Sequence, residues 1–174
     1  MHVNKLLTAD QSLTGQLSIY RENLIMGKVV AVCISEKKGT QKHPVQEAEF
    51  IEDWGIKNDA HAGKWHRQVS LLSYDRIEAF RARGAEVEDG AFGENLVVQG
   101  FDFSSLPVGT RFRCGDVVLE MTQIGKECHH GCAIFQKMGD CIMPREGVFT
   151  KVIHGGSIRE GMEFEQIAVN EQQG

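Results

Sequence analysis

Short apolar runs separated by glycine turns are the feature of this sequence that most constrains its fold. Several runs are rich in the β-branched residues that favour strands. Strands are expected over residues 29–34, 44–52, 69–72, 95–98, 110–114, 117–122, 147–153 and 161–169, with Gly115-Asp116 as a hairpin turn between two of them. Two helices are expected, over residues 74–83, capped by Ser73 and stopped by Gly84, and over residues 131–138.

No repeating strand–helix–strand rhythm is visible along the chain. The pattern therefore predicts a β-rich α+β fold, a single domain built on a closed or partly closed β-barrel with a few peripheral helices. The 174 residues are enough for one domain with a sizeable core. The first residues scatter leucines among polar residues, whereas Met26-Gly27 opens a clear strand. We therefore expect an N-terminal extension over 1–25, a domain over 26–169 and a polar tail over 170–174.

Composition argues against several functional classes. A net charge of −5 gives no support for a nucleic-acid partner, which usually requires a basic patch. No apolar run approaches the roughly 20 residues that a membrane span needs, and no secretory signal is visible. An odd number of cysteines, 5, is typical of a reducing cytoplasm and not of a disulfide framework. Phosphate-binding glycine loops and serine nucleophile motifs are also missing.

The chemistry of the chain is concentrated between residues 125 and 147. This segment holds three of the 5 cysteines and two of the 7 histidines: Cys128, Cys132, Cys141, His129 and His130. The C-x3-C pair can bind zinc together with Cys141 or a histidine, although a second pair is missing. Alternatively, Lys126 and the imidazoles favour a reactive Cys128 thiolate, able to attack an electrophile, carry sulfane sulfur as a persulfide or ligate a soft metal. The third alternative is a small apolar residue in a core turn.

Several polar residues outside the cysteine segment are candidates for binding. Asp59 and His61 can form a carboxylate–imidazole pair, or can hold the backbone of their glycine-rich loop. Glu94 and Asn95 follow Gly93 and can bind a polar ligand or form a turn. Arg145 can bind a phosphate through its planar guanidinium, or form a surface ion pair.

Five pieces of the chain match one known family in the same order. They are residues 55–63 followed by 67–72, residues 92–96, residues 108–120, Cys128, and residues 147–152 followed by 156–161. With these pieces the sequence resembles the MOSC domain, named for the C-terminal domain of molybdenum cofactor sulfurase. The resemblance covers roughly residues 27–168. It implies a β-barrel-like fold with a ligand cleft and an association with the molybdenum cofactor, molybdopterin.

The resemblance also assigns a role to Cys128, which matches the family's characteristic cysteine a few residues beyond a strand ending in Glu-x-Thr, here residues 120–122. That cysteine is proposed to carry or transfer sulfur, or to ligate molybdenum. Glu127 stands where many members have proline. The additional Cys132 and Cys141 leave open which thiol acts, and whether one holds sulfur while another resolves it.

The resemblance thus implies a cytoplasmic protein that handles the molybdenum cofactor, as a sulfurtransferase, a persulfide carrier or a molybdenum-dependent catalyst. Its catalytic thiols would be Cys128, Cys132 and Cys141; its cofactor-binding residues would be Asp59, His61, Glu94, Asn95, His129, His130 and Arg145. No pyridoxal phosphate site is expected in this chain, so a separate cysteine desulfurase and a molybdoenzyme are the expected partners. Two alternatives stay open: a non-catalytic module that binds the cofactor or a small anion, and a small structural zinc domain.

Overall fold

The structure, a computed structural model, describes residues 25–128 and 131–167. In chain order its elements are β1 (Met26–Ile34), β2 (His43–Val45), β3 (Glu47–Ile51), β4 (Gly55–Ile56), β5 (Val69–Ser73), α2 (Tyr74–Ala82), β6 (Leu96–Gln99), the 3-10 helix η1 (Phe103–Ser105), β7 (Arg111–Cys114), β8 (Val117–Ile124), α3 (Ala133–Met138), α4 (Met143–Glu146), β9 (Val148–His154), β10 (Gly156–Arg159) and β11 (Glu163–Ile167). The predicted extension over 1–25 and tail over 170–174 stay predictions, since all but Ile25 lie outside the described residues.

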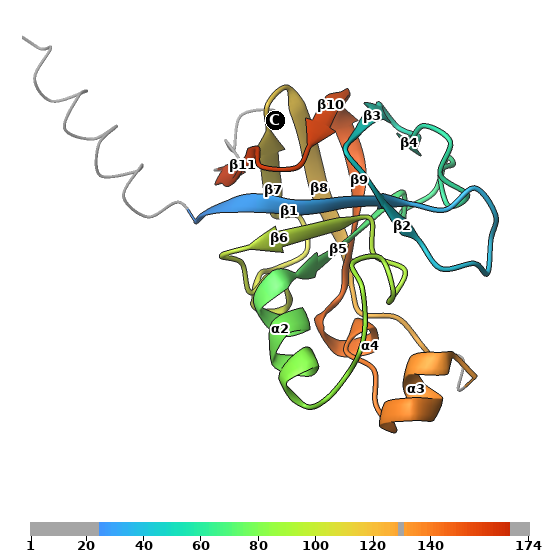
Figure 1. Cartoon of the computed structure of the whole chain (residues 1–174). Coiled ribbons are helices and arrows are strands. Elements are labelled where there is room, and N and C mark those ends of the chain that lie inside the picture. The colour runs from blue at the N-terminus through green and yellow to red at the C-terminus, as the bar shows by residue number, and fades with distance from the viewer. Residues whose placement is uncertain (1–24, 129–130, 168–174) are drawn as a thin grey trace, which may run out of the picture.

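The strands confirm the predicted barrel. The main sheet has the order β11-β7-β8-β9-β5-β6-β1-β2, and β11 also pairs with β1, so that the sheet closes on itself with β2 as an additional strand. A separate sheet, β10-β3-β4, lies at one end of the barrel, and α2, α3 and α4 lie toward the other (Figure 1). Closure leaves few unpaired strand edges, which is how many β-rich folds avoid edge-to-edge association.

Alternating side chains fill the barrel. Along β8 the burial alternates between buried and half-buried positions, as expected for a strand with one face in the core. Four phenylalanines pack together at the centre: Phe101, Phe103, Phe112 and Phe164. The ring centroids of Phe112 and Phe164 are 5.3 Å apart. Each buried ring of this kind contributes about 1.5–3 kcal/mol through the hydrophobic effect.

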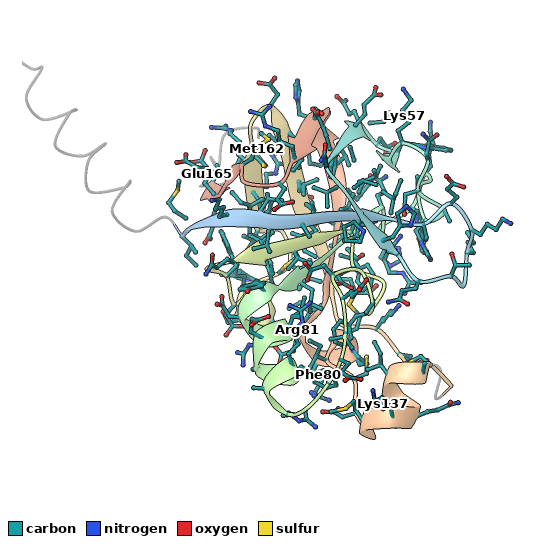
Figure 2. The ribbon with its side chains drawn as sticks, viewed as in Figure 1. Lys57, Phe80, Arg81, Lys137, Met162 and Glu165 are labelled. Atoms are coloured by element: carbon teal, nitrogen blue, oxygen red, sulfur yellow. The ribbon has the colours of Figure 1, made fainter. Side chains whose placement is uncertain are left out.

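A second apolar cluster covers the outside of the barrel wall and carries the cysteine segment. Ile77 and Phe80, which are three residues apart and share one face of α2, are buried in it. Cys141 and Met143, on either side of the start of α4, belong to the same cluster. Figure 2 shows Phe80 on α2 and Lys137 on α3 at one end of the molecule. The barrel thus holds the cysteine segment against a packed surface.

The barrel contains one strand–helix–strand unit, although the sequence shows no repeating rhythm of this kind. β5 and β6 are parallel and are connected through α2. A single such unit in an otherwise antiparallel barrel produces no repeating rhythm in the sequence, so the pattern did not reveal it. The expectation of one strand over 44–52 was wrong, because this segment forms two strands. β2 pairs with β1, whereas β3 pairs with β10 and β4.

The predicted end of α2 agrees with the structure, whereas the predicted capping by Ser73 does not. Gly84 follows α2 with a φ of 94°, as expected for a stop. Ser73 occupies the N-cap position, but its side chain makes no capping hydrogen bond and its hydroxyl is buried. The short elements β4, β10, η1 and α4 were not predicted, because elements of two to four residues carry too little periodicity. In the described part of the chain, no helix combines the length and apolar character that crossing a bilayer requires.

Candidate functional site

The three cysteines of the predicted site lie together. The Sγ atoms of Cys128, Cys132 and Cys141 are all within 4.8 Å of one another. Cys128 is half-buried, Cys132 is exposed and Cys141 is buried. No disulfide joins any of the five cysteines, all of which lie in the described part of the chain. A loop, a helix cap and an inter-helix segment therefore converge on one cluster of sulfur atoms.

The turn through α3 returns the chain to its starting point. Cys132 is the N-cap of α3, and its Sγ accepts a hydrogen bond from the backbone N of Phe135 at 3.4 Å. Gly139 ends the helix with a φ of 66°, a left-handed conformation that glycine adopts without strain. The next residue, Asp140, accepts a hydrogen bond from the backbone N of Cys141 at 2.8 Å. These local features place Cys141 beside the cap of the helix that precedes it.

Gly125 fixes the other side of the sulfur cluster. Its backbone N donates to the carbonyl oxygen of Gly147 at 2.6 Å, which joins the end of β8 to the end of α4. Its φ is 66°, and a Cβ at this position would collide with the carbonyl oxygen of Pro144. Only glycine therefore allows the loop that carries Cys128 to pass so close to α4.

Replacing Gly125 by alanine is expected to lower the free energy of unfolding by about 2 kcal/mol or more, because left-handed strain and a backbone collision act together. Gly139→Ala is the matched control: Gly139 has the same φ of 66°, but a Cβ there meets nothing within 4 Å. That variant should lose only about 1 kcal/mol. Urea denaturation of both variants measures the difference. Equal losses would show that the contact with Pro144 is unimportant.

A cavity of about 380 Å³ opens beside the sulfur atoms. Its lining residues are Lys126, Glu127, Cys128, Phe135, Asp140, Cys141, Pro144 and Arg145. Arg145 faces this cavity but is already partnered, since its Nη1 lies 2.9 Å from Asp140 Oδ1. Hydrogen bonds from Arg145 and Arg83 hold the pKa of the Asp140 carboxyl well below its usual range. Because Arg145 and Asp140 neutralise each other, Arg145 adds no net positive charge to the cavity.

The cysteines differ in burial and therefore in reactivity. Burial raises the pKa of the Cys141 thiol to about 11, and the neighbouring Cys132 and Cys128 add to this effect. Burial also raises the pKa of Cys114 to about 12 and the pKa of Cys33 further still. These two strand residues are buried. Because the thiolate is the nucleophile, the solvent-reached thiols of Cys128 and Cys132 are the better placed members of the set.

A second cavity, of about 370 Å³, adjoins the first. It is lined among others by His61, Trp65, Arg67, Ser70, Asn95 and Phe149, and it shares Lys126 and Glu127 with the first cavity. Two cationic side chains, Arg67 and Lys126, therefore border this cavity, and Lys126 lies two residues before Cys128 in the sequence. Both cavities meet at the two residues that directly precede this cysteine.

Arg67 is a cationic residue of this cavity that the sequence did not single out. Its guanidinium carbon lies 4.8 Å from the centroid of Trp65 and 5.5 Å from the centroid of Phe149, so that the charge is held between two rings. Its Nε is buried and has no hydrogen-bond partner among the described residues. A buried donor without a partner is costly, so this atom is suited to an anionic or polar ligand. The only available signal was its place at the start of residues 67–72, a piece that matches the family.

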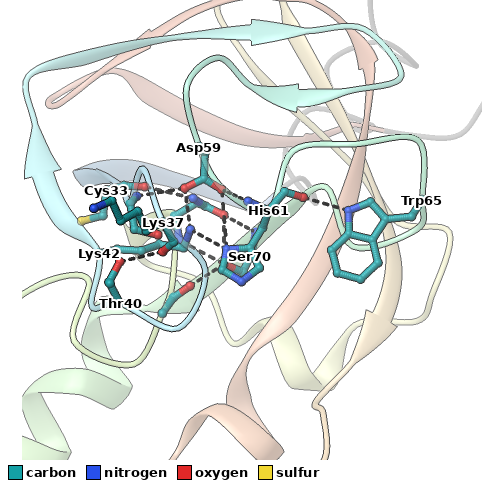
Figure 3. Close-up of polar contacts among 11 residues, drawn as sticks. Cys33, Lys37, Thr40, Lys42, Asp59, His61, Trp65 and Ser70 are labelled. Atoms are coloured by element: carbon teal, nitrogen blue, oxygen red, sulfur yellow. Dashed lines mark hydrogen bonds and ion pairs between the residues drawn. The ribbon is translucent and has the colours of Figure 1, made fainter.

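Asp59 supports the second cavity from behind and does not line it. Its Oδ1 accepts from Lys42 Nζ at 2.5 Å and from Ser35 N at 3.0 Å, while its Oδ2 accepts from His61 N at 3.1 Å (Figure 3). Lys42 is only 3% exposed. Asp59 is thus paired mainly with Lys42, which no sequence pattern singles out, and His61 Nδ1 lies 3.9 Å from Asp59 Oδ2.

His61 contributes a neutral imidazole to the cavity. Burial and the nearby Lys42 ammonium lower its pKa. The Lys42 Nζ is 3.2 Å from His61 Nδ1, which fits a lysine donor and an unprotonated ring nitrogen. Burial likewise lowers the pKa of Lys42. The predicted carboxylate–imidazole pair is therefore a three-residue arrangement in which the lysine lies between the other two.

Glu94 and Asn95 hold strands and turns in place. Both oxygens of the fully buried Glu94 carboxyl accept from backbone, from Gly90 N at 2.6 Å and Phe92 N at 3.0 Å. Asn95 accepts from Ser70 N at 3.1 Å and donates to the carbonyl oxygen of Cys33 at 3.0 Å. Asn95 also lines the second cavity, whereas Glu94 supports the turn behind it. His129 and His130 lie outside the described residues.

Glu94 should make stability depend on pH. Burial raises its pKa from 4.5 to about 7, although its two backbone donors act in the opposite direction. The folded chain therefore binds more protons than the unfolded chain between these values, so this stabilising contribution is complete below pH 4.5 and is lost as pH rises through 7. The expected loss is up to about 3 kcal/mol. Urea denaturation of the native chain and Glu94→Gln across this range tests it, and parallel pH profiles would contradict it.

A seven-strand barrel closed by β11 and β1, with a cysteine-bearing loop at a cavity, defines the class of protein. The family model described as "MOSC domain" matches residues 58–165, more than half of the sequence. The chain belongs to the MOSC domain family, as the resemblance of its motifs predicted. The matched residues include Cys128 and most of both cavities.

Solved structures share this fold at low sequence identity. The YuaD protein from Bacillus subtilis is 18% identical with a TM-score of 0.71, over 85% of this chain and 99% of that one. YiiM from Geobacillus stearothermophilus is 17% identical with a TM-score of 0.64, over 84% of this chain and 77% of that one. YiiM from Escherichia coli is 19% identical with a TM-score of 0.56, over 83% and 71%. No curated protein matches the sequence.

Proposed function

We propose that this chain handles the molybdenum cofactor through Cys128, which carries sulfur for the cofactor or ligates its metal. Membership of the MOSC domain family supports a function related to this cofactor. The observation that carries the finer assignment is the position of Cys128. Its half-buried thiol borders one cavity, and the two residues before it are shared with a second cavity that holds Arg67.

The residues of the second cavity suit the molybdopterin part of the cofactor. The buried Arg67 Nε lacks a partner among the described residues, and a phosphate oxygen would satisfy it. Lys126 adds a second cation, while Asn95 and His61 offer polar groups to the pterin. The bound cofactor would supply the molybdenum centre, and thiolate sulfur is a ligand suited to soft metals. Arg67 is thus a better phosphate-binding candidate than Arg145, whose charge is paired with Asp140.

The carrier role requires one thiol exchange. The Cys128 thiolate attacks the outer sulfur of a donor persulfide, of the kind that a cysteine desulfurase carries. The donor S–S bond breaks, a new S–S bond forms on Cys128, and the donor cysteine leaves as a thiolate. The exchange involves no net oxidation, so no further reagent is needed. Lys126, which precedes Cys128 by two residues, places a cationic side chain in the wall of the same cavity.

Mass spectrometry of the full chain tests the proposal. After incubation with a cysteine desulfurase and cysteine, the peptide with Cys128 should gain one sulfur atom. In parallel, the chain should retain molybdopterin, and Arg67→Met should weaken retention about tenfold or more because a charge-assisted contact is lost. Arg145→Met is the matched control and should have a smaller effect. A chain that gains no sulfur and retains no molybdopterin would end the proposal.

The second cavity also favours a non-catalytic binding module as an alternative function. Such a module would hold the cofactor for a molybdoenzyme without covalent chemistry at Cys128. The same two measurements separate these functions: retention of molybdopterin without sulfur on the Cys128 peptide supports the module. Sulfur on this peptide supports the carrier.

A further inference from the structure

We infer that Cys128, Cys132 and Cys141 together bind a zinc ion through three sulfur ligands, with the fourth coordination position facing the adjoining cavity. The three Sγ atoms lie within 4.8 Å of one another. Zinc–sulfur bonds of about 2.3 Å in a tetrahedral arrangement require sulfurs about 3.8 Å apart. The cluster is therefore within about 1 Å of the necessary spacing, a change that rotation of the exposed Cys132 side chain can supply.

The backbone around the cluster is held before any metal binds. Gly125 is joined to Gly147 by a backbone hydrogen bond of 2.6 Å, which positions the loop that carries Cys128. The Asp140 carboxylate accepts from Cys141 N and is itself held by Arg145 and Arg83 at 2.9 Å and 2.8 Å. A pre-arranged donor set binds a metal more tightly, because less conformational entropy is lost on binding.

The donor set indicates the type of metal. Three thiolates select soft or borderline ions, and zinc with three protein ligands keeps a fourth position for water or another ligand. A cavity of about 380 Å³ lies directly beside Cys128 and Cys141, so there is room for that ligand. Three thiolates on one zinc ion leave a net charge of −1, which Lys126 in the cavity wall would partly offset, whereas Arg145 is already paired with Asp140.

The zinc site does not depend on the proposed cofactor function, and the two compete for one sulfur atom. Coordination to zinc withdraws electron density from the Cys128 thiolate and so lowers its nucleophilicity toward sulfane sulfur. Zinc should therefore suppress sulfur loading of Cys128, and removal of zinc by a chelator should restore it. Zinc binding by a chain that gains no sulfur even after the zinc is removed supports this site and contradicts the carrier. Sulfur loading of a metal-free chain that does not bind added zinc supports the carrier and contradicts this site.

Metal titration of the full chain tests the inference. The reduced, metal-free protein should bind one Zn²⁺ in competition with a chromophoric chelator. Co²⁺ in the same site should show a thiolate-to-metal charge-transfer band that zinc abolishes. Cys132→Ser should weaken zinc binding by at least about 100-fold, since even outer-shell changes cost 10–100-fold. Because Cys132 is exposed, this variant should stay folded.

Two further variants complete the test. Cys132→His places a nitrogen ligand where the sulfur ligand was, so it should bind zinc more tightly than Cys132→Ser does. Cys114→Ala removes a cysteine that lies in the barrel core, away from the cluster, and should bind zinc as the native chain does. The three-sulfur site is refuted if Co²⁺ gives no charge-transfer band, or if Cys132→Ser binds zinc as tightly as the native chain.

Discussion

Replacing Cys128 by alanine is expected to abolish sulfur loading of the chain by a cysteine desulfurase. The thiol at this position is half-buried at a cavity, where a donor persulfide can reach it and water is partly excluded. Cys141 cannot take over, because burial raises its pKa to about 11 and leaves it a thiol at neutral pH. The sulfur gained per chain, measured by mass spectrometry of the intact protein, should fall to background.

Cys132→Ala is the matched control for this experiment. Cys132 is exposed and its sulfur caps α3, so that its loss should leave loading of Cys128 within about a factor of three. Loading that survives Cys128→Ala and is lost in Cys132→Ala would assign the carrier role to the second cysteine. Loading that survives in both variants would exclude a single acceptor thiol. Circular dichroism of each variant shows whether the barrel is intact.

Replacing Asp59 by alanine is expected to lower the free energy of unfolding by about 3–5 kcal/mol. The side chains of Asp59 and Lys42 are 0% and 2% exposed, and their charged atoms are 2.5 Å apart. Removing the carboxylate leaves the ammonium buried without its counter-charge, and it also leaves the backbone N of Ser35 and of His61 without their acceptor. Urea denaturation measures the loss.

Glu49→Ala is the control for burial. Glu49 also forms an ion pair with a lysine, Lys57, at 2.6 Å, but each side chain of that pair is 56% exposed. Exposed pairs contribute about 1 kcal/mol or less, so this variant should be nearly as stable as the native chain. Similar losses in the two variants would show that the buried pair has no special importance. Because His61 lines the second cavity, Asp59→Ala should also weaken molybdopterin retention.

Much of the barrel was predictable because its signals are local. Apolar runs and the Gly115-Asp116 turn specify the β7–β8 hairpin, and the spacing of Ile77 and Phe80 specifies the buried face of α2. The parallel β5–β6 pair was not predictable from the same signals. Its partners are residues distant in the chain, and the runs that form them look alike in parallel and antiparallel sheets.

Part of the candidate site was likewise predictable from the sequence and part was not. Cys128, Cys132 and Cys141 stand out because cysteines are few and these lie within a short segment. Arg67 and Lys42 do not stand out, because a lone cationic residue is usually exposed to solvent. The guanidinium of Arg67 is positioned by the rings of Trp65 and Phe149, and Phe149 is distant in the sequence.

The sequence by itself determined the family, the barrel and the short segment that holds the three candidate thiols, since these depend on residue type and short-range spacing. Only the tertiary structure decided which charges are buried, which two cavities share a wall, and that three sulfur atoms meet within 4.8 Å. Burial and distance arise from long-range packing of the β8 loop, α3 and α4 against the barrel, and no local pattern encodes them.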